Sequence, residues 1–262
     1  MKEGNKLIRI KFSKHGLMKY TGHLDTMRYF QRVIRRSGID AAYSEGFSPH
    51  QIMSFAQPLS VGVESNGEYF DLEVTVLSSA SDMMERMNAV SAEGMEIRDI
   101  VLLPDRAKKA MATVHSAEYT VIFRPGHEPE WDIYKAVRAF KDMPSLKITK
   151  KSKKSVREIQ LKDFVYSLDI EEKTLGFLFP DGPLSGDEIK DPEKKVPYLR
   201  MRLSAASGDN VKPALLIRAL KGIMVQGSDE EEEYPSLTDL LITREDIFDS
   251  DGKPLSKAGE RF

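Results

Sequence analysis

Residues 19–71 read KYTGHLDTMRYFQRVIRRSGIDAAYSEGFSPHQIMSFAQPLSVGVESNGEYFD, and the patterns in this stretch decide the fold of the first part of the chain. Apolar side chains recur at the spacing of a helix that buries one face: Leu24, Met27, Phe30 and Ile34. We therefore predict a helix from His23 to Ser37, ended by Gly38, with these four residues in the core. Two short extended segments follow, and residues 68–77 (EYFDLEVTVL) predict the clearest strand of this part.

The flanking sequence extends this pattern on both sides. Residues 6–13 alternate apolar and polar positions, a Met-rich helix is predicted over 80–91, and a strand is predicted over 95–103. The resulting order β-α-β-β-α-β is that of a ferredoxin-like unit. The second half has a similar outline, with strands near 116–124, 145–151, 156–170, 173–180 and 196–205 and helices at 129–141 and 213–221.

These elements predict an α+β fold with two ferredoxin-like lobes built on antiparallel sheets. The predicted domains are an N-terminal lobe over 1–104, a C-terminal α+β lobe over 113–225, and an acidic segment with a terminal hairpin over 226–262. A linker is predicted between Pro104 and Ala112. Five consecutive acids within 226–236 repel one another, so we expect that part to be mobile.

The charge of the chain is unevenly distributed. The formal net charge is -2, yet residues 1–60 hold ten Lys or Arg against four Asp or Glu, and residues 135–163 hold ten against three. Residues 229–262 hold only four basic residues against eleven acidic ones. Two basic zones and an acidic end indicate polyanion binding or charge-steered association with a partner.

Several function classes are excluded by what the sequence lacks. The 262 residues include no cysteine, which excludes a Cys nucleophile, a zinc–thiolate site and a protein-ligated iron–sulfur cluster. The motifs typical of nucleotide hydrolases, dehydrogenases, zinc proteases and serine hydrolases are absent. No run approaches the ~18–20 apolar residues of a membrane span, and the N-terminal residues lack the apolar region of a signal peptide. We therefore expect a cytoplasmic protein.

The first candidate site is a basic face on the predicted helix, followed by an aromatic loop. The face consists of Arg28, Arg32, Arg35 and Arg36, whose spacing puts them on one side of the helix. Arginine presents a planar fork that suits phosphate oxygens, so this face predicts contact with phosphate or the RNA backbone. The alternative is a solvated face partly neutralised by Asp25. In the loop, Tyr43 and Phe47 would stack unpaired bases, or Phe47 would only pack into the core.

Three further residues near this helix are candidates for chemistry. His23 and Asp25 open the helix and His50 closes the loop beyond it, so either histidine is a candidate acid–base catalyst. A metal site would need the loop to fold back on the helix start. We favour structural hydrogen bonding for each of them, and we expect no metal and no cofactor.

Two more charged groups complete the candidate set. Glu64, Glu68 and Asp71 would hold Arg32 or Arg36 if their strand packs beside the helix. The second basic zone forms a strand–loop–strand arm suited to sequence-independent backbone contact, or else an exposed hairpin kept soluble by edge lysines. Its residues are Lys147, Lys150, Lys151, Lys153, Lys154 and Arg157.

The motifs of this chain resemble those of a known family. They are GHLDxxRxxxRxxRR over 22–36, YSEGFSPH over 43–50, SFAQPLSVGVES over 54–65 and GEYFD over 67–71, with weaker blocks over 154–163 and 203–220. They closely resemble the radical SAM-linked, or radical SAM-associated, family, a domain of unknown function. The resemblance implies a domain fused behind, or encoded beside, a B12-binding radical SAM protein, often near a ribonuclease of the E/G type. It implies an accessory role in RNA modification or maturation and transfers no catalytic residue.

Three functional hypotheses follow. The preferred one is a non-catalytic accessory module that binds RNA, or an RNA-bearing substrate, for a separate B12-binding radical SAM enzyme encoded nearby. The first rival is a metal-independent RNA-cleaving or RNA-modifying enzyme that uses His23 or His50. The second rival is a protein–protein adaptor. The chain itself lacks the CxxxCxxC motif, since it lacks cysteine, so it is not the radical enzyme.

Overall fold

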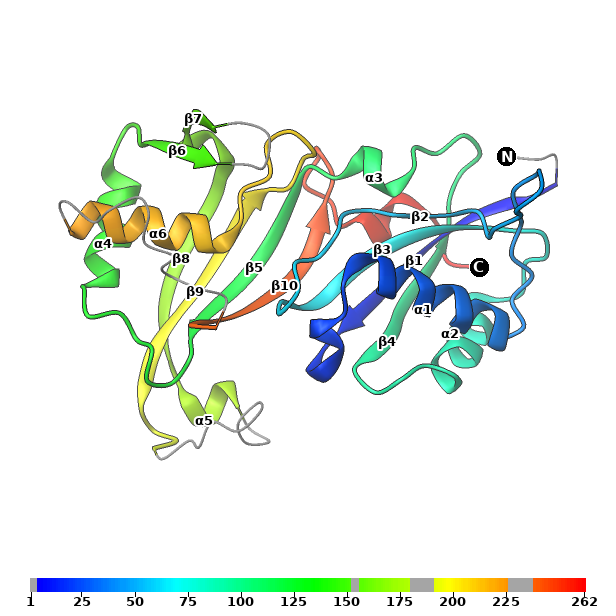
Figure 1. The fold of residues 1–262 in the computed structure, drawn as a ribbon, viewed down its shortest axis with the longest axis horizontal. Coiled ribbons are helices and arrows are strands. Elements are labelled where there is room, and N and C mark those ends of the chain that lie inside the picture. Colours follow the sequence, from blue (N-terminus) through cyan, green and yellow to red (C-terminus); the bar gives the residue numbers. More distant parts are fainter. Residues whose placement is uncertain (1–3, 152–155, 180–190, 226–237) are drawn as a thin grey trace. The chain divides into compact units, whose positions relative to one another are not determined.

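The structure is a computed structural model that describes residues 4–151, 156–179, 191–225 and 238–262. The chain is α+β (Figure 1). Its strands are β1 (Lys6–Lys14), β2 (Met53–Phe55), β3 (Glu64–Val74), β4 (Met95–Leu102), β5 (Ser116–Phe123), β6 (Lys147–Lys151), β7 (Val156–Gln160), β8 (Val165–Thr174), β9 (Lys195–Ser204) and β10 (Leu240–Phe248). Its α-helices are α1 (His23–Arg36), α2 (Ala80–Ala89), α3 (Ala110–Thr113), α4 (Ile133–Asp142), α5 (Leu175–Leu178) and α6 (Pro213–Met224). The 3-10 helices are η1 (Gly16–Tyr20), η2 (Leu161–Phe164) and η3 (Leu255–Ala258).

The chain divides into two compact units. The first comprises residues 1–116 together with 244–262, and the second comprises residues 117–243. The C-terminal residues therefore group with the first unit, whereas the sequence assigned them to a separate segment. Strand β10 begins in the second unit and ends in the first.

The first unit follows the predicted order β-α-β-β-α-β, from β1 to β4. Its sheet has the order β4-β1-β3, and β3 also pairs with β2 and with β10. Strand β1 is antiparallel to both β3 and β4, and β2 is antiparallel to β3. The main sheet as a whole is mixed, so the prediction of purely antiparallel sheets is not confirmed.

Helices α1 and α2 lie on one face of this sheet, and the core of the unit lies beneath them (Figure 1). Four phenylalanines form its centre, with ring centroids 4.5–6.1 Å apart: Phe12, Phe30, Phe55 and Phe70. Phe30 and Ile34 are buried there, as predicted. Leu24 is 60% exposed, so its predicted core position is wrong. It lies in the first turn of α1, where helical spacing alone does not determine burial.

The opposite face of this sheet carries a buried ion pair. Arg9 and Asp71 face each other on β1 and β3, their side chains are both 1% exposed, and Arg9 Nε donates to Asp71 Oδ1 over 2.7 Å. Arg9 also donates to the carbonyls of Lys108 and Leu255, while the Ala110 N–H donates to Asp71 Oδ2 over 2.6 Å. The pair therefore anchors the predicted linker and η3 to the sheet.

In the second unit the strand order is β10-β5-β9-β8, and α4 and α6 lie side by side (Figure 1). Strands β6 and β7 form a separate antiparallel hairpin between α4 and β8. The strand predicted over 173–180 is wrong beyond Thr174. The Thr174 side chain accepts a hydrogen bond from the Phe177 N–H and so starts the short helix α5. The acidic run within 226–236 lies outside the described residues.

Candidate nucleic-acid interface

Local signals explain where the arginine-bearing helix begins and ends. Gly22 precedes the first residue of α1, and Asp25 lies in the first turn, where a negative charge complements the positive end of the helix. Arg35 and Arg36 lie in the last turn, where a positive charge is favourable. Gly38 has a φ of +66°, the left-handed conformation that ends many helices. The predicted start at His23 is therefore confirmed, and the helix ends at Arg36, one residue before the predicted Ser37.

The four arginines are exposed on α1, on the side away from the buried residues Thr26, Phe30, Val33 and Ile34. Arg28 Nη1 lies 3.5 Å from Asp25 Oδ1, so this pair is the neutralisation considered from the sequence. Within the described part of the chain, Arg32, Arg35 and Arg36 make no side-chain hydrogen bond or ion pair. Three guanidinium groups on one side of α1 are thus available to an external anion.

The loop after α1 is closed at its neck and open at its tip. The Ser44 N–H donates to the His50 carbonyl over 2.8 Å, the His50 N–H donates to Ser44 Oγ over 3.1 Å, and Tyr43 forms a bridge with Gln51. Phe47 is fully exposed at the tip, and Tyr43 is about half exposed. The alternative that Phe47 packs into the core is therefore wrong, and the ring projects into solvent.

The candidate catalytic residues have separate structural partners. His50 Nδ1 lies 2.9 Å from Ser44 Oγ, which makes His50 part of the loop neck. The His23 ring packs edge-on against Phe55 at a centroid distance of 5.5 Å. Burial, followed by the charge of Lys14, lowers the pKa of His23. Asp25 is paired with Arg28. Among the residues that the structure describes, no group of three His, Asp or Glu side chains could hold a metal ion.

The three carboxylates of β3 do not hold the arginines of α1. Asp71 pairs with Arg9, Glu68 Oε2 lies 3.3 Å from Arg244 Nη1, and Glu64 Oε1 lies 3.2 Å from Lys19 Nζ. The expectation that they neutralise Arg32 or Arg36 is wrong, because the carboxylates of Glu68 and Asp71 are buried in the sheet while those arginines face solvent.

The second basic zone, Lys147 to Arg157, is called the lysine arm here, and several of its side chains contact other residues of the second unit. Lys150 Nζ donates to the Asn210 carbonyl over 2.7 Å, and burial lowers the pKa of Lys150. Arg157 Nη2 donates to the Gly208 carbonyl and to Asp209, and Lys147 pairs with Glu158. Lys151 ends β6, while Lys153 and Lys154 lie outside the described residues.

A buried polar cluster near the start of α1 was not predicted from the sequence, although one of its members, Glu68, was named with other partners. Lys14, Ser65, Glu68 and Arg244 are all buried, and Lys14 Nζ donates to the Thr21 carbonyl over 2.7 Å. Burial lowers the pKa of Lys14 and raises that of Glu68, although Arg244 opposes the latter shift. Glu68 is one of several acidic residues in β3, and the sequence does not show that Arg244, 176 residues away, pairs with it.

Comparisons with known proteins give a family and a distant structural neighbour. The family model described as "Uncharacterized protein conserved in bacteria (DUF2344)" matches residues 7–213. No curated protein matches the chain. A chain of the "Crystal Structure of a Cbf5-Nop10-Gar1 Complex" is similar with a TM-score of 0.45 and 10% identity, over 93% of this chain and 50% of that chain. The protein thus spans about half the length of that neighbour. No helix in the described residues is long and apolar enough to cross a membrane.

Proposed function

The chain belongs to this bacterial family, and we propose that it is a non-catalytic accessory module that binds RNA with unpaired bases. It would present this RNA, or an RNA-bearing substrate, to a separate B12-binding radical SAM enzyme, which is the partner that the motif resemblance implies. The absence of cysteine is consistent with a reducing cytoplasm as the place of action.

One observation carries the proposal. Three exposed arginines of α1 have no partner among the described residues, and the chain then runs directly into a closed loop that exposes Phe47 at its tip. Proteins that bind single-stranded nucleic acid combine positive charge for the backbone with aromatic rings for the bases. The lysine arm is the secondary contact, because Lys147, Lys150 and Arg157 each have an internal partner.

The scaffold that supports this surface is proposed to be ferredoxin-like in both units. In the first unit the strand order is β4-β1-β3, with β2 also on β3, and in the second it is β10-β5-β9-β8. Numbered within each unit, both orders read 4-1-3-2, with two helices at equivalent positions in the chain order. The β6–β7 hairpin is then an insertion between the first helix and the second strand of the second unit.

The test is the salt dependence of binding to a fluorescent single-stranded RNA. Each phosphate contact to a single strand contributes about 0.7 to the slope of log K against log salt. Arg32→Ala with Arg36→Ala should therefore lower the slope by about 1.4. Phe47→Ala should weaken binding by ~1–3 kcal/mol without changing the slope, because stacking releases no counterions.

The matched control removes two exposed arginines from elsewhere in the same unit, Arg98→Ala with Arg261→Ala. It should leave both affinity and slope close to those of the unaltered protein. Equal losses in the two double variants would show that net charge alone drives binding, and the proposed surface would be wrong. RNA that is cleaved or modified by the purified protein, with loss of that activity in His50→Ala, would favour the enzyme. Failure to bind RNA at low salt, with co-purification of a radical SAM protein, would favour the adaptor.

A further inference from the structure

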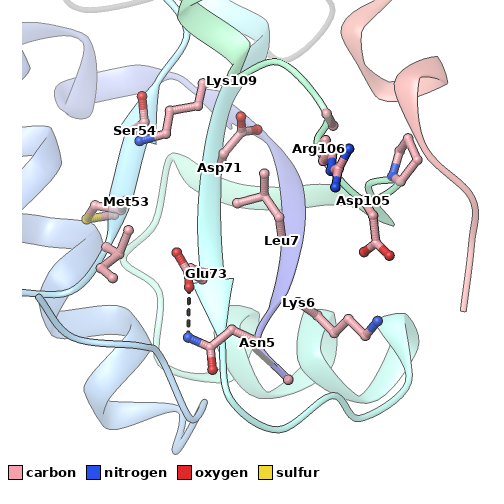
Figure 2. A pocket seen from close by; sticks show the side chains of 14 residues that line it. Asn5, Lys6, Leu7, Met53, Ser54, Asp71, Glu73, Asp105, Arg106 and Lys109 are labelled. Atoms are coloured by element: carbon pink, nitrogen blue, oxygen red, sulfur yellow. Dashed lines mark hydrogen bonds between the residues drawn. The ribbon is translucent and has the colours of Figure 1, made fainter. Parts of the chain in front are cut away.

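A cavity lies in the first unit, formed by residues from several separate segments. Its volume is about 570 Å³, within the range of small-molecule sites. It is lined by residues 4–7 at the start of β1, by residues 52–54 at β2, by Asp71 and Glu73 of β3, and by residues 104–107 and Lys109 after β4. Figure 2 shows the carboxylates of Asp71 and Glu73 between Met53 and Leu7.

The strand register explains why these side chains share one face. Leu7 is opposite Glu73, and Ser54 is opposite Asp71, so all four project from the side of the sheet away from α1 and α2. Ile8 and Leu72, the alternate residues, lie in the core beneath the helices. The alternation of side chains along the strands thus places these four residues on the face that holds the cavity.

The charge at the bottom of the cavity is not balanced by the protein. Glu73 is only 6% exposed, and its Oε1 accepts a hydrogen bond from Asn5 Nδ2 over 2.7 Å (Figure 2). No cation within the described residues pairs with it, whereas Asp71 has Arg9. A buried carboxylate is normally paired with a positive charge. Glu73 is therefore built to receive a positively charged group from outside.

The rim has the opposite character. Lys6, Arg106 and Lys109 are exposed and have no ion-pair partner among the described residues, and they outnumber the one exposed carboxylate of the rim, Asp105. Arg106 has a φ of +63° and is the only residue other than glycine with a positive φ in the described chain. Residues other than glycine rarely adopt this backbone conformation, and those that do cluster at functional sites. The rim therefore favours an anionic group.

We propose that this cavity binds a small zwitterion, whose ammonium or guanidinium group pairs with Glu73 and whose carboxylate or phosphate group pairs with Arg106 and Lys109. Leu7 and Ile52 would contact the apolar part between the two charged groups. This site is independent of the RNA surface, because none of its residues lies on α1 or in the 43–50 loop.

The proposal is tested with two matched pairs of probes by ligand-observed NMR titration of the full chain. L-Lysine and O-phosphoethanolamine carry both charges, whereas cadaverine and ethanolamine carry only the cation. Each zwitterion should bind about tenfold or more tightly than its matched cation. A preference for lysine would assign a carboxylate to the rim, and a preference for phosphoethanolamine would assign a phosphate.

Three variants separate the two halves of the site. Glu73→Gln keeps the shape of the side chain but removes its charge, and it should weaken the binding of all four probes about tenfold or more. In the double variant Arg106→Ala with Lys109→Ala, each zwitterion should bind only as tightly as its matched cation. Arg98 lies outside the cavity, so Arg98→Ala should leave the affinity of all four probes unchanged. Absence of binding by all four probes, or unaltered binding in Glu73→Gln with an unchanged melting temperature, would overturn the proposal whatever the RNA experiment shows.

Discussion

Asp71→Ala is the substitution that should destabilise the first unit most clearly. The carboxylate accepts hydrogen bonds from Arg9 Nε over 2.7 Å, from Arg9 Nη2 over 3.1 Å and from the Ala110 N–H over 2.6 Å. Its removal leaves the Arg9 guanidinium buried with only two backbone carbonyls as acceptors. Breaking a buried pair in this way costs about 3–5 kcal/mol.

A second Asp–Arg pair in the same unit provides the matched control. Asp25 and Arg28 are 3.5 Å apart, but their side chains are 67% and 66% exposed. Solvent screens such a pair, so Asp25→Ala should cost less than ~1 kcal/mol. The residue types are identical, so the comparison sets a buried Asp–Arg pair against an exposed one.

The measurement is urea unfolding followed by far-ultraviolet circular dichroism, with hydrogen exchange to locate the effect. In Asp71→Ala, exchange should accelerate in residues 104–113, which the ion pair anchors. Adding Arg9→Met should recover part of the loss, because the unpaired buried charge is then gone. If Asp71→Ala costs no more than Asp25→Ala, or if the double variant is less stable than the single one, this account of the pair is wrong.

Two further predictions concern pH and packing. Burial and the charge of Lys14 lower the pKa of His23 from its ordinary value of 6.5. Below pH 6.5 the unfolded chain therefore binds more protons at this residue than the folded protein does. The unfolding free energy consequently falls as the pH falls from 6.5 toward the lowered pKa. His23→Gln should remove this part of the fall in urea midpoints, and parallel pH curves for the two proteins would contradict it. A Cβ on Gly67 would lie 2.7 Å from the Glu245 carbonyl oxygen, so Gly67→Ala should destabilise by ~1–3 kcal/mol. A Cβ on Gly222 of α6 would meet nothing within 4 Å, so Gly222→Ala should stabilise the protein by about 0.5–1 kcal/mol. If the thermal unfolding midpoints of Gly67→Ala and Gly222→Ala shift in the same direction, the packing argument is wrong.

The sequence predicts local structure well because helical and strand periodicities are local properties. The order of elements from β1 to β4 and the ends of α1 follow from the spacing of apolar residues and from Gly38. The exposed arginine face follows from the same spacing. Ion-pair partners are not predictable in this way, since Arg9 and Asp71 are 62 residues apart and Arg244 and Glu68 are 176 apart.

The same limit applies to the cavity around Glu73. Its lining comes from four separate parts of the chain, and the sequence does not show that these parts meet. The alternation over residues 6–13 is typical of a half-buried strand, whereas Arg9 on its polar face is buried by residues far along the chain. Polar residues in strands therefore indicate the solvent side only where nothing distant covers them.

The grouping of residues 244–262 with the first unit has a consequence for biosynthesis. Lys11 pairs with Asp246 over 2.7 Å, the Tyr69 hydroxyl donates to Asp246, and residues 102 and 260 exchange backbone hydrogen bonds. A ribosome produces residues 1–116 first and most of the second unit next, and β10, which begins in the second unit and ends in the first, comes only afterwards. Glu68 therefore lacks Arg244 until nearly the whole chain has been made, so the first unit is expected to be completed only at the end of synthesis.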